Sequence, residues 1–327
     1  MHIDPEADLL PDAVSDAFAG WLTATPRDTP VCAVHDRDVD GLAAGFLWEQ
    51  FLGGLGFTAA RAWMPAPGET LFGNGFARRV GQAFPASLFL LTLHPARQAL
   101  LPSWPRYDLH PADVAWQHPP NPAWAVHARG EPLAPAAARP WVAALGTVAC
   151  FGTRASFPFM REIKARYTGK YLQAVADLLA AALCHGSDVG PLAAQAIEAH
   201  ESPRALMQSA GAVALALRAA AADVSGALQA AEVVQPQLLG RLAIIEVAAA
   251  AHIEALVAAR WSARLPGHIV LAVNLWQAAA HYAARSSSGI AVQDFLRTFA
   301  RTGVPLPVGP DGRGEVTREA WEAWRAA

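Results

Sequence analysis

The stretch VCAVHDRDVDGLAAG, residues 31–45, decides the first part of the fold. Residues 31–34 form a short continuous apolar run, which is typical of a buried parallel strand. From Gly41 onward the apolar residues recur with helical spacing, so we expect a helix directly after the acidic turn. Asp38 and Asp40 would then lie just beyond the carboxyl end of a strand, where open α/β sheets bind ligands.

This acidic turn has two interpretations. Two carboxylates one residue apart can both face one hard divalent cation, and Gly41 lets the backbone enter the helix without a Cβ in the way. The alternative is an Asp-rich turn that caps the helix, which is what most Asp clusters before helices do. His35 could join a metal site or cap the same helix. The residues alone leave both interpretations open.

Four segments, taken in order, resemble the motifs of the DHH phosphoesterase superfamily, which includes RecJ-type exonucleases, nanoRNases and manganese-dependent pyrophosphatases. Residues 35–41 resemble the first motif, and their sequence is most similar to that of the archaeal RecJ-like branch, which also contains relatives of Cdc45. Residues 87–95 (SLFLLTLHP) resemble the second motif, an apolar strand ending in a metal-binding Asp. Residues 104–111 (WPRYDLHP) resemble the Asp-His-His motif, and residues 142–152 (VAALGTVACFG) resemble the fourth motif, a Gly-containing strand end that normally delivers another Asp.

The resemblance continues through the rest of the chain. Residues 170–183 and Ser202-Pro203 look like the family's helical connector, and residues 241–274 and 284–299 look like its second domain, called DHHA1. The implied fold class is α/β: a mostly parallel sheet in a DHH-like domain, a helical connector, and a smaller mixed α/β DHHA1-like domain across a cleft. The expected ranges are 1–160 for the DHH-like domain, 161–235 for the connector and 236–327 for the DHHA1-like domain. The expected inner strands of the first sheet are 31–34 and 88–93; the second domain is expected to have strands at 242–247, 268–273 and 281–284 and helices near 252–263 and 292–300.

The metal-ligand positions depart from the family pattern. In the family, four motifs bring Asp and His ligands to a pair of divalent ions that activate a water and steady the phosphoryl oxygens. Asp38 and Asp40 match the first motif, and Asp108 and His110 match the outer members of the third, whose first His is Leu109 here. At the second motif the Asp position falls on Thr92 or His94, and at the fourth it falls on Cys150.

These changes predict a weakened or absent two-metal centre. A Leu cannot ligate, and Cys in place of Asp replaces a hard oxygen by a soft sulfur that disfavours Mg²⁺ or Mn²⁺. We interpret Cys150 as a small buried hydrophobe. The remaining candidate is a rebuilt site for one divalent ion, Mn²⁺, Mg²⁺ or Zn²⁺, with no bound ion as the other outcome. Its candidate ligands are Asp38, Asp40, His94, Asp108 and His110.

Two further segments are candidates for phosphate binding. Arg285, Ser286 and Ser287 resemble the Arg-Ser stretch that faces substrate phosphates in DHHA1 domains, although the Gly-Gly-Gly-His loop that normally follows is replaced by the proline-containing residues 303–314. The alternative for this stretch is an ordinary polar turn between a strand and a helix. The second segment interleaves basic and aromatic residues, as single-stranded nucleic acid requires, or else is a solvated helix face. Its members are Arg154, Phe157, Phe159, Arg161, Lys164, Arg166, Tyr167 and Lys170.

Composition limits the classes of function. The chain of 327 residues has 53% hydrophobic residues, enough for about two domains with cores. The net charge of −3 argues against a protein that is basic all over, and no Walker-type Lys loop is present. No run is long and uncharged enough to span a bilayer, and three scattered cysteines fit a reducing cytoplasm, so we expect a cytoplasmic protein.

Two functions remain after these exclusions. The first is a catalytically impaired DHH relative that binds single-stranded nucleic acid, nucleotides or a partner protein. The second is a working metal-dependent phosphodiesterase, an exonuclease or short-oligonucleotide hydrolase, with a rebuilt ligand set. We favour the first, because losing several members of a metal centre together costs orders of magnitude in activity. The residues leave the oligomeric state open.

Overall fold

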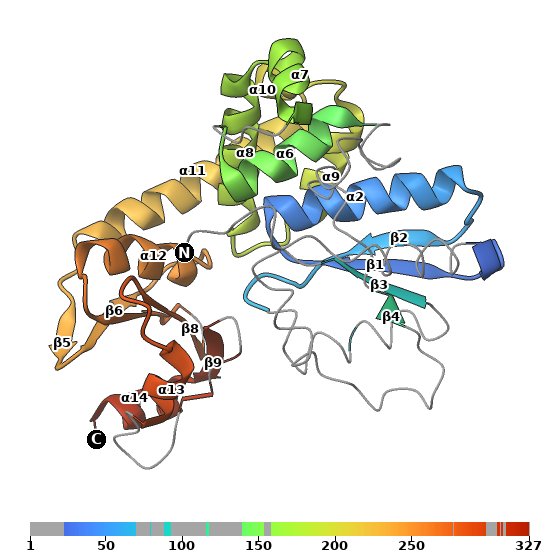
Figure 1. Cartoon of the computed structure of the whole chain (residues 1–327). Helices are drawn as coiled ribbons and strands as arrows, with labels where there is room; N and C mark the ends of the chain where they lie inside the picture. The colour runs from blue at the N-terminus through green and yellow to red at the C-terminus, as the bar shows by residue number, and fades with distance from the viewer. Residues whose placement is uncertain are drawn as a thin grey trace. The chain divides into compact units, whose positions relative to one another are not determined.

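The computed structural model describes residues 23–69, 79, 88–92, 116–117, 139–153, 158–276, 278–298, 306–307, 309 and 312–326. The chain divides into two compact units. The first comprises Met1–Leu183 and Val189–Arg218, and the second comprises Cys184–Asp188 and Ala219–Ala327. Figure 1 shows the helices and strands of both units.

Among its described residues, the first unit contains a parallel sheet with the strand order β2-β1-β3-β4. The strands are β1 (Val31–His35), β2 (Ala60–Trp63), β3 (Leu88–Thr92) and β4 (Trp116–Gln117). The two inner strands are β1 and β3, as the apolar runs predicted. All five residues of β1 are buried, which explains why this strand is a continuous apolar run rather than an alternating one.

The helix α2 (Val39–Gly54) follows β1 directly and is buried on nearly all sides. It contacts β1, β2 and β3 as well as the helix α6 (Pro140–Phe151), and Figure 1 shows it running along the sheet. A helix covered on opposite sides needs apolar residues all round rather than one apolar stripe. The further helices of this unit are α7 (Pro158–Tyr167), α8 (Gly169–Leu183), α9 (Gly190–Ala199) and α10 (Pro203–Gln208).

The helix α11 (Ala212–Glu232) carries the chain from the first unit into the second, where the described strands form a mixed sheet with the order β5-β6-β7-β8-β9. The strands are β5 (Gln237–Leu239), β6 (Leu242–Val247), β7 (Ile269–Asn274), β8 (Ala279–Ser286) and β9 (Arg313–Thr317). β6 and β7 are parallel, and the other neighbours are antiparallel. The three strands expected from the sequence correspond to β6, β7 and β8.

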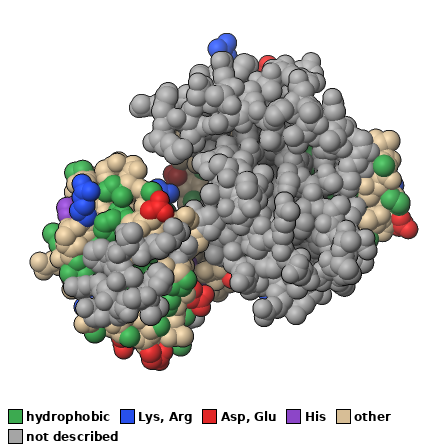
Figure 2. Space-filling model, turned by 60° about the horizontal axis from the view of Figure 1, so that its bottom comes forward, with side chains coloured by type: hydrophobic (Ala, Val, Ile, Leu, Met, Phe, Trp, Pro, Cys, Tyr) green, Lys and Arg blue, Asp and Glu red, His purple; other side chains and the backbone are tan. Residues whose placement is uncertain are grey.

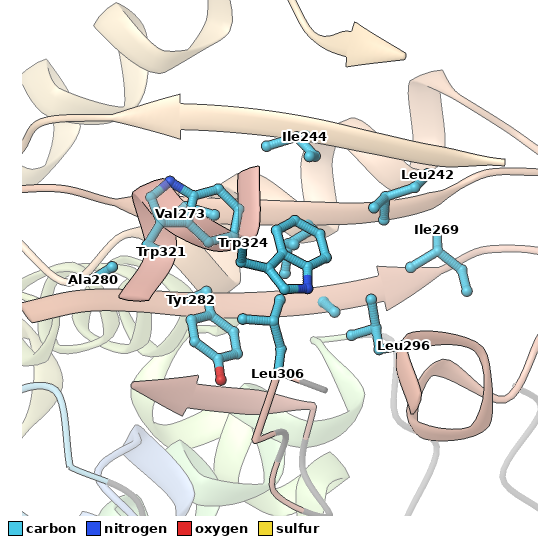
Figure 3. Close-up of a cluster of buried hydrophobic side chains, with 12 residues drawn as sticks. Leu242, Ile244, Ile269, Val273, Ala280, Tyr282, Leu296, Leu306, Trp321 and Trp324 are labelled. Carbon is cyan, nitrogen blue, oxygen red and sulfur yellow. The ribbon is translucent and has the colours of Figure 1, made fainter. Parts of the chain in front are cut away.

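Helices cover both faces of this second sheet. The helix α12 (Glu254–Arg264) contacts β7 and β8. The hydrophobic cluster drawn in Figure 3 contains Leu296 of α13 (Val292–Thr298) and two Trp side chains of α14 (Arg318–Ala326), but no residue of α12. Because side chains alternate between the faces of a strand, the cluster and α12 lie on opposite faces. The mixed α/β architecture agrees with the expectation for the C-terminal part.

No helix in the described ranges is both long enough and apolar enough to span a lipid bilayer. The proline-rich residues 118–138 lie outside the described part of the chain. Pro140, which follows them in the sequence, is the first residue of α6, a position where its missing N–H breaks no helical hydrogen bond.

Candidate functional site at the first strand–helix turn

The turn between β1 and α2 brings Asp38 and Asp40 to the carboxyl end of the sheet, as predicted. Asp38 is the N-cap of α2, with φ −142° and ψ 177°, and its Oδ1 accepts a hydrogen bond of 2.7 Å from the backbone N–H of Gly41. Asp40 lies in the first turn of the helix and is only 2% exposed. Capping therefore accounts for one oxygen of Asp38. Asp40 contributes a second, buried carboxyl group at the same helix end.

Two glycines permit this turn because each faces an atom that a side chain would meet. A Cβ on Gly41 would lie 2.3 Å from the backbone oxygen of Asp36, and a Cβ on Gly45 would lie 2.2 Å from Cδ2 of His35. The helix therefore approaches the strand end more closely than it could if either position carried a residue with a Cβ.

His35, the last residue of β1, is 1% exposed. Burial lowers the pKa of His35 to about 4, against the opposing effect of the hydrogen bond between its Nδ1 and the backbone oxygen of Asp36 at 2.8 Å. The imidazole is therefore neutral at physiological pH, which is the form that ligates metals. His35 pairs in register with Thr92, so the end of β3 lies beside the acidic turn.

Arg37 has a role that the sequence analysis missed. Its Nε donates to the backbone oxygen of Leu183 at 3.0 Å, and its Nη1 donates to the backbone oxygen of Pro65 at 3.0 Å. The guanidinium thereby ties the acidic turn to the end of α8 and to the segment after β2. An Arg surrounded by acids in the sequence gives no signal for such a bridge between distant backbone carbonyls.

The other proposed metal ligands cannot be placed beside this turn. His94, Asp108 and His110 lie outside the described residues. Within the described ranges, no group of three His, Cys, Asp or Glu side chains is arranged to hold a metal ion. Asp38 and Asp40 are therefore the members of the predicted ligand set that lie among the described residues.

The prediction that residues 142–152 form a strand end is wrong, because residues 140–151 form the helix α6. Cys150 therefore lies in the last turn of a helix. The side chains from Trp141 to Val148 are all buried, and an uninterrupted apolar run of this length does not distinguish a buried helix from a buried strand. Pro140 at the first helical position was the available signal for a helix.

The basic segment forms part of α7. Arg161 is exposed and Lys164 is half-buried, while the guanidinium of Arg166 lies 5.0 Å from the ring centroid of Tyr167. Arg154 lies outside the described residues. Arg166 and Tyr167 also line a cavity of about 530 Å³ in the first unit. Its other lining residues are Arg139, Pro140, Trp141, Glu198, Ala199 and Glu201, so its lining carries charges of both signs.

The Arg-Ser stretch ends β8 in the second unit. Arg285 is exposed, and Ser286 Oγ accepts a hydrogen bond of 3.3 Å from the backbone N–H of Ser288. Ser287 is the exposed residue between them, and Gly289 follows with φ +71°. This is a polar turn whose guanidinium and hydroxyls face solvent. Neither Arg161 nor Arg285 forms an ion pair with another residue in the described part of the chain.

On the face drawn in Figure 2, the described surface carries both acidic and basic side chains, and these residues form no continuous basic patch there.

The described part of the chain combines a parallel α/β unit, which has an acidic turn after β1, with a mixed α/β unit. The chain is similar to a structure of the exonuclease RecJ bound to manganese, with a TM-score of 0.62 and 17% identity over 98% of this chain and 94% of that one. It is also similar to RecJ from Thermus thermophilus in complex with Mn²⁺, with a TM-score of 0.55 and 20% identity over 97% of this chain, which spans about half (54%) of that one. No family model and no curated protein matches the sequence. The chain therefore shares the fold of the exonuclease RecJ, which is the fold that the motif resemblance predicted.

Proposed function

We propose that this protein is a RecJ-like DHH relative with an impaired metal centre, which binds single-stranded nucleic acid or nucleotides in a cleft between a DHH-like and a DHHA1-like domain. The observation that carries the proposal is the arrangement of the two Asp residues of the first motif at the turn between β1 and α2. Asp38 and Asp40 are retained at the strand end, but Asp38 also caps α2 through Oδ1, so this residue has a structural role besides any role in metal binding.

The donor set fits a divalent ion only in part. Asp38 and Asp40 offer hard carboxylate oxygens, and the neutral His35 stands at the same strand end. The sequence places Thr92 or His94, and Leu109, where the family has further Asp or His ligands. A bound ion would polarise a phosphoryl oxygen and its attacking water. A single ion held by Asp38, Asp40, His94, Asp108 and His110 is the alternative, and it would make the protein an active phosphodiesterase.

Metal content is the first test. Protein prepared in Mn²⁺ and desalted should carry well under two equivalents, and chelation should leave its melting temperature nearly unchanged, since an ion bound only to the folded state would stabilise it by mass action. A nuclease assay on single strands and dinucleotides with Mg²⁺, Mn²⁺ and Zn²⁺ accompanies it. Two tightly held equivalents with turnover would establish the active enzyme instead.

Two variants of Asp38 separate capping from metal binding. Asn caps helices about as well as Asp, so Asp38→Asn should keep the stability of the metal-free protein, whereas Asp38→Ala should cost about 1 kcal/mol. If Asp38 also ligates an ion, Asp38→Asn should lower the metal content although the cap is kept. Equal metal content in wild type and Asp38→Asn would restrict this residue to its capping role.

Polyanion binding is the second test. The affinity for a short single strand should fall steeply with salt, because each neutralised phosphate releases counterions. Arg285→Ala and Arg161→Ala should each reduce the slope of log K against log salt by about 1, while Arg241→Ala, at an exposed Arg in the turn between β5 and β6, should leave it unchanged. Fluorescence anisotropy at several salt concentrations measures the slopes. Absence of binding even at low ionic strength would remove the nucleic-acid function and favour a protein partner.

A further inference from the structure

Two histidines of the second unit form a pair outside the candidate site. His281 lies on β8, where it pairs in register with Asn274 of β7 and with Glu315 of β9. His252 lies between β6 and α12. The two rings are 4.9 Å apart between centroids and cross at 89°.

A carboxylate lies near each imidazole without completing its hydrogen bonding. His252 Nδ1 is 3.8 Å from Oε1 of Glu254, and His281 Nδ1 is 3.9 Å from Oε2 of Glu315. Glu254 is 7% exposed, and Glu315 is mostly exposed. Among the described residues, both Nδ1 atoms and Oε2 of Glu254 are buried without a hydrogen-bond partner. Unsatisfied polar atoms at these positions make the cluster sensitive to its protonation state.

The elements around the pair contribute few other charges. On β9, Arg313 acts on Glu254, and β7 presents the neutral Asn274. The segment Cys184–Asp188 contributes Asp188 and His185, whose Nε2 is 3.5 Å from Asp223. On α12, Arg260 and Arg264 pair with Glu232.

The pKa shifts of two members of the cluster act in the same direction. Burial lowers the pKa of His281, and the neighbouring charge of His252 lowers it further against the opposing charges of Glu315 and Glu254. Burial alone would raise the pKa of Glu254, but the contact with His252, a backbone hydrogen bond and the charge of Arg313 together lower it. Both groups therefore take up protons more readily once the cluster is opened, so acidification favours the open form.

The same loop that carries His252 holds the segment Cys184–Asp188. The backbone N–H of His252 donates to the oxygen of Cys184 at 2.7 Å, and a Cβ on Gly186 would lie 1.9 Å from the oxygen of Ala250. On the other side, Asn274 Nδ2 donates to the oxygens of Ala249 and Ala251, both at 2.9 Å. The loop is thus fixed between β7 and a segment that connects α8 to α9.

We propose that His252 and His281 form a proton-sensitive latch, which holds the segment Cys184–Asp188 on the loop before α12 at neutral pH and releases it on acidification. A proton on each ring would place positive charges on two rings that contact each other in a partly desolvated site. Opening the loop relieves this repulsion, because it returns His252 to water and breaks its backbone bond to Cys184. The closed state is favoured above the ordinary pKa of His and is lost as the pH falls through the lowered pKa of His281.

Hydrogen exchange of the full chain tests the latch. After correction for the intrinsic rate, the protection of the amides at residues 184–188 and 249–252 should fall about tenfold for each pH unit over which one proton is taken up on opening. His281→Gln should flatten this dependence, because Gln cannot be protonated. His268→Gln, at another part-buried His of the same unit, should retain it. A wild-type protein without this pH dependence, or one whose dependence survives in His281→Gln, would overturn the proposal.

A measurement on the unmodified protein covers the case in which His281→Gln does not fold. Two-dimensional NMR of the imidazole resonances should show that His281 titrates below its usual range. Titration of His281 at its ordinary value would exclude the latch.

Discussion

Gly41→Ala is expected to cost about 3 kcal/mol or more in the free energy of unfolding, although Ala is the better helix former. The added Cβ would lie 2.3 Å from the backbone oxygen of Asp36 and 2.8 Å from its nitrogen. A flexible side chain could move away, but these atoms belong to the backbone of the turn that leaves β1. The strand end and the helix must therefore separate, which also breaks the hydrogen bond from Gly41 to Asp38.

Gly53→Ala is the matched control on the same helix. A Cβ on Gly53 meets nothing within 4 Å, so this variant should be more stable than wild type by about 0.5–1 kcal/mol through the helix propensity of Ala. Denaturant unfolding followed by circular dichroism compares the two variants. If Gly41→Ala were as stable as Gly53→Ala, the close approach of α2 to Asp36 would be wrong, and with it the geometry assigned to the acidic turn.

The sequence predicted the elements whose pattern is local. The sequence identified β1 from the apolar run 31–34, the turn from the acids after it, and α2 from the helical spacing beyond Gly41. A buried strand and a capped helix start each have a sequence pattern that extends over only a few residues. The same local patterns did not determine whether Asp38 caps the helix or ligates a metal ion. A carboxylate at that position can cap, ligate or do both, and the distinction depends on groups contributed by distant strands.

The features that the sequence did not reveal depend on contacts between distant segments. Residues 142–152 were assigned to a strand end because they resemble the fourth motif of the family. Burial on several sides removes the amphipathic period that would have indicated a helix. The contact of His252 with His281 joins positions 29 residues apart, and the bridge from Arg37 reaches Leu183 across 146 residues. None of these pairings has a spacing that would mark it in the sequence.

Trp321→Ala is expected to cost about 3–5 kcal/mol, the range for removing a large aromatic side chain from a core. Trp321 is fully buried in the cluster of Figure 3 and stacks on Trp324 at 5.1 Å between ring centroids. Its Nε1 also donates to Oε1 of Glu246 at 2.9 Å, so the variant loses a hydrogen bond to a charged group in addition to the packing.

Two further variants divide this cost. Trp321→Phe keeps a six-membered aromatic ring but removes the five-membered ring that carries the Nε1 donor, so it should cost less than Trp321→Ala by an amount that measures the packing of the retained ring. Trp276→Ala, at a Trp that is 56% exposed, should change the stability by less than about 0.5 kcal/mol. Thermal unfolding of the full chain distinguishes these outcomes. If Trp321→Ala were as mild as Trp276→Ala, α14 would not be packed on the sheet through Trp321, and the unit that presents Arg285 at the end of β8 would have to be packed differently.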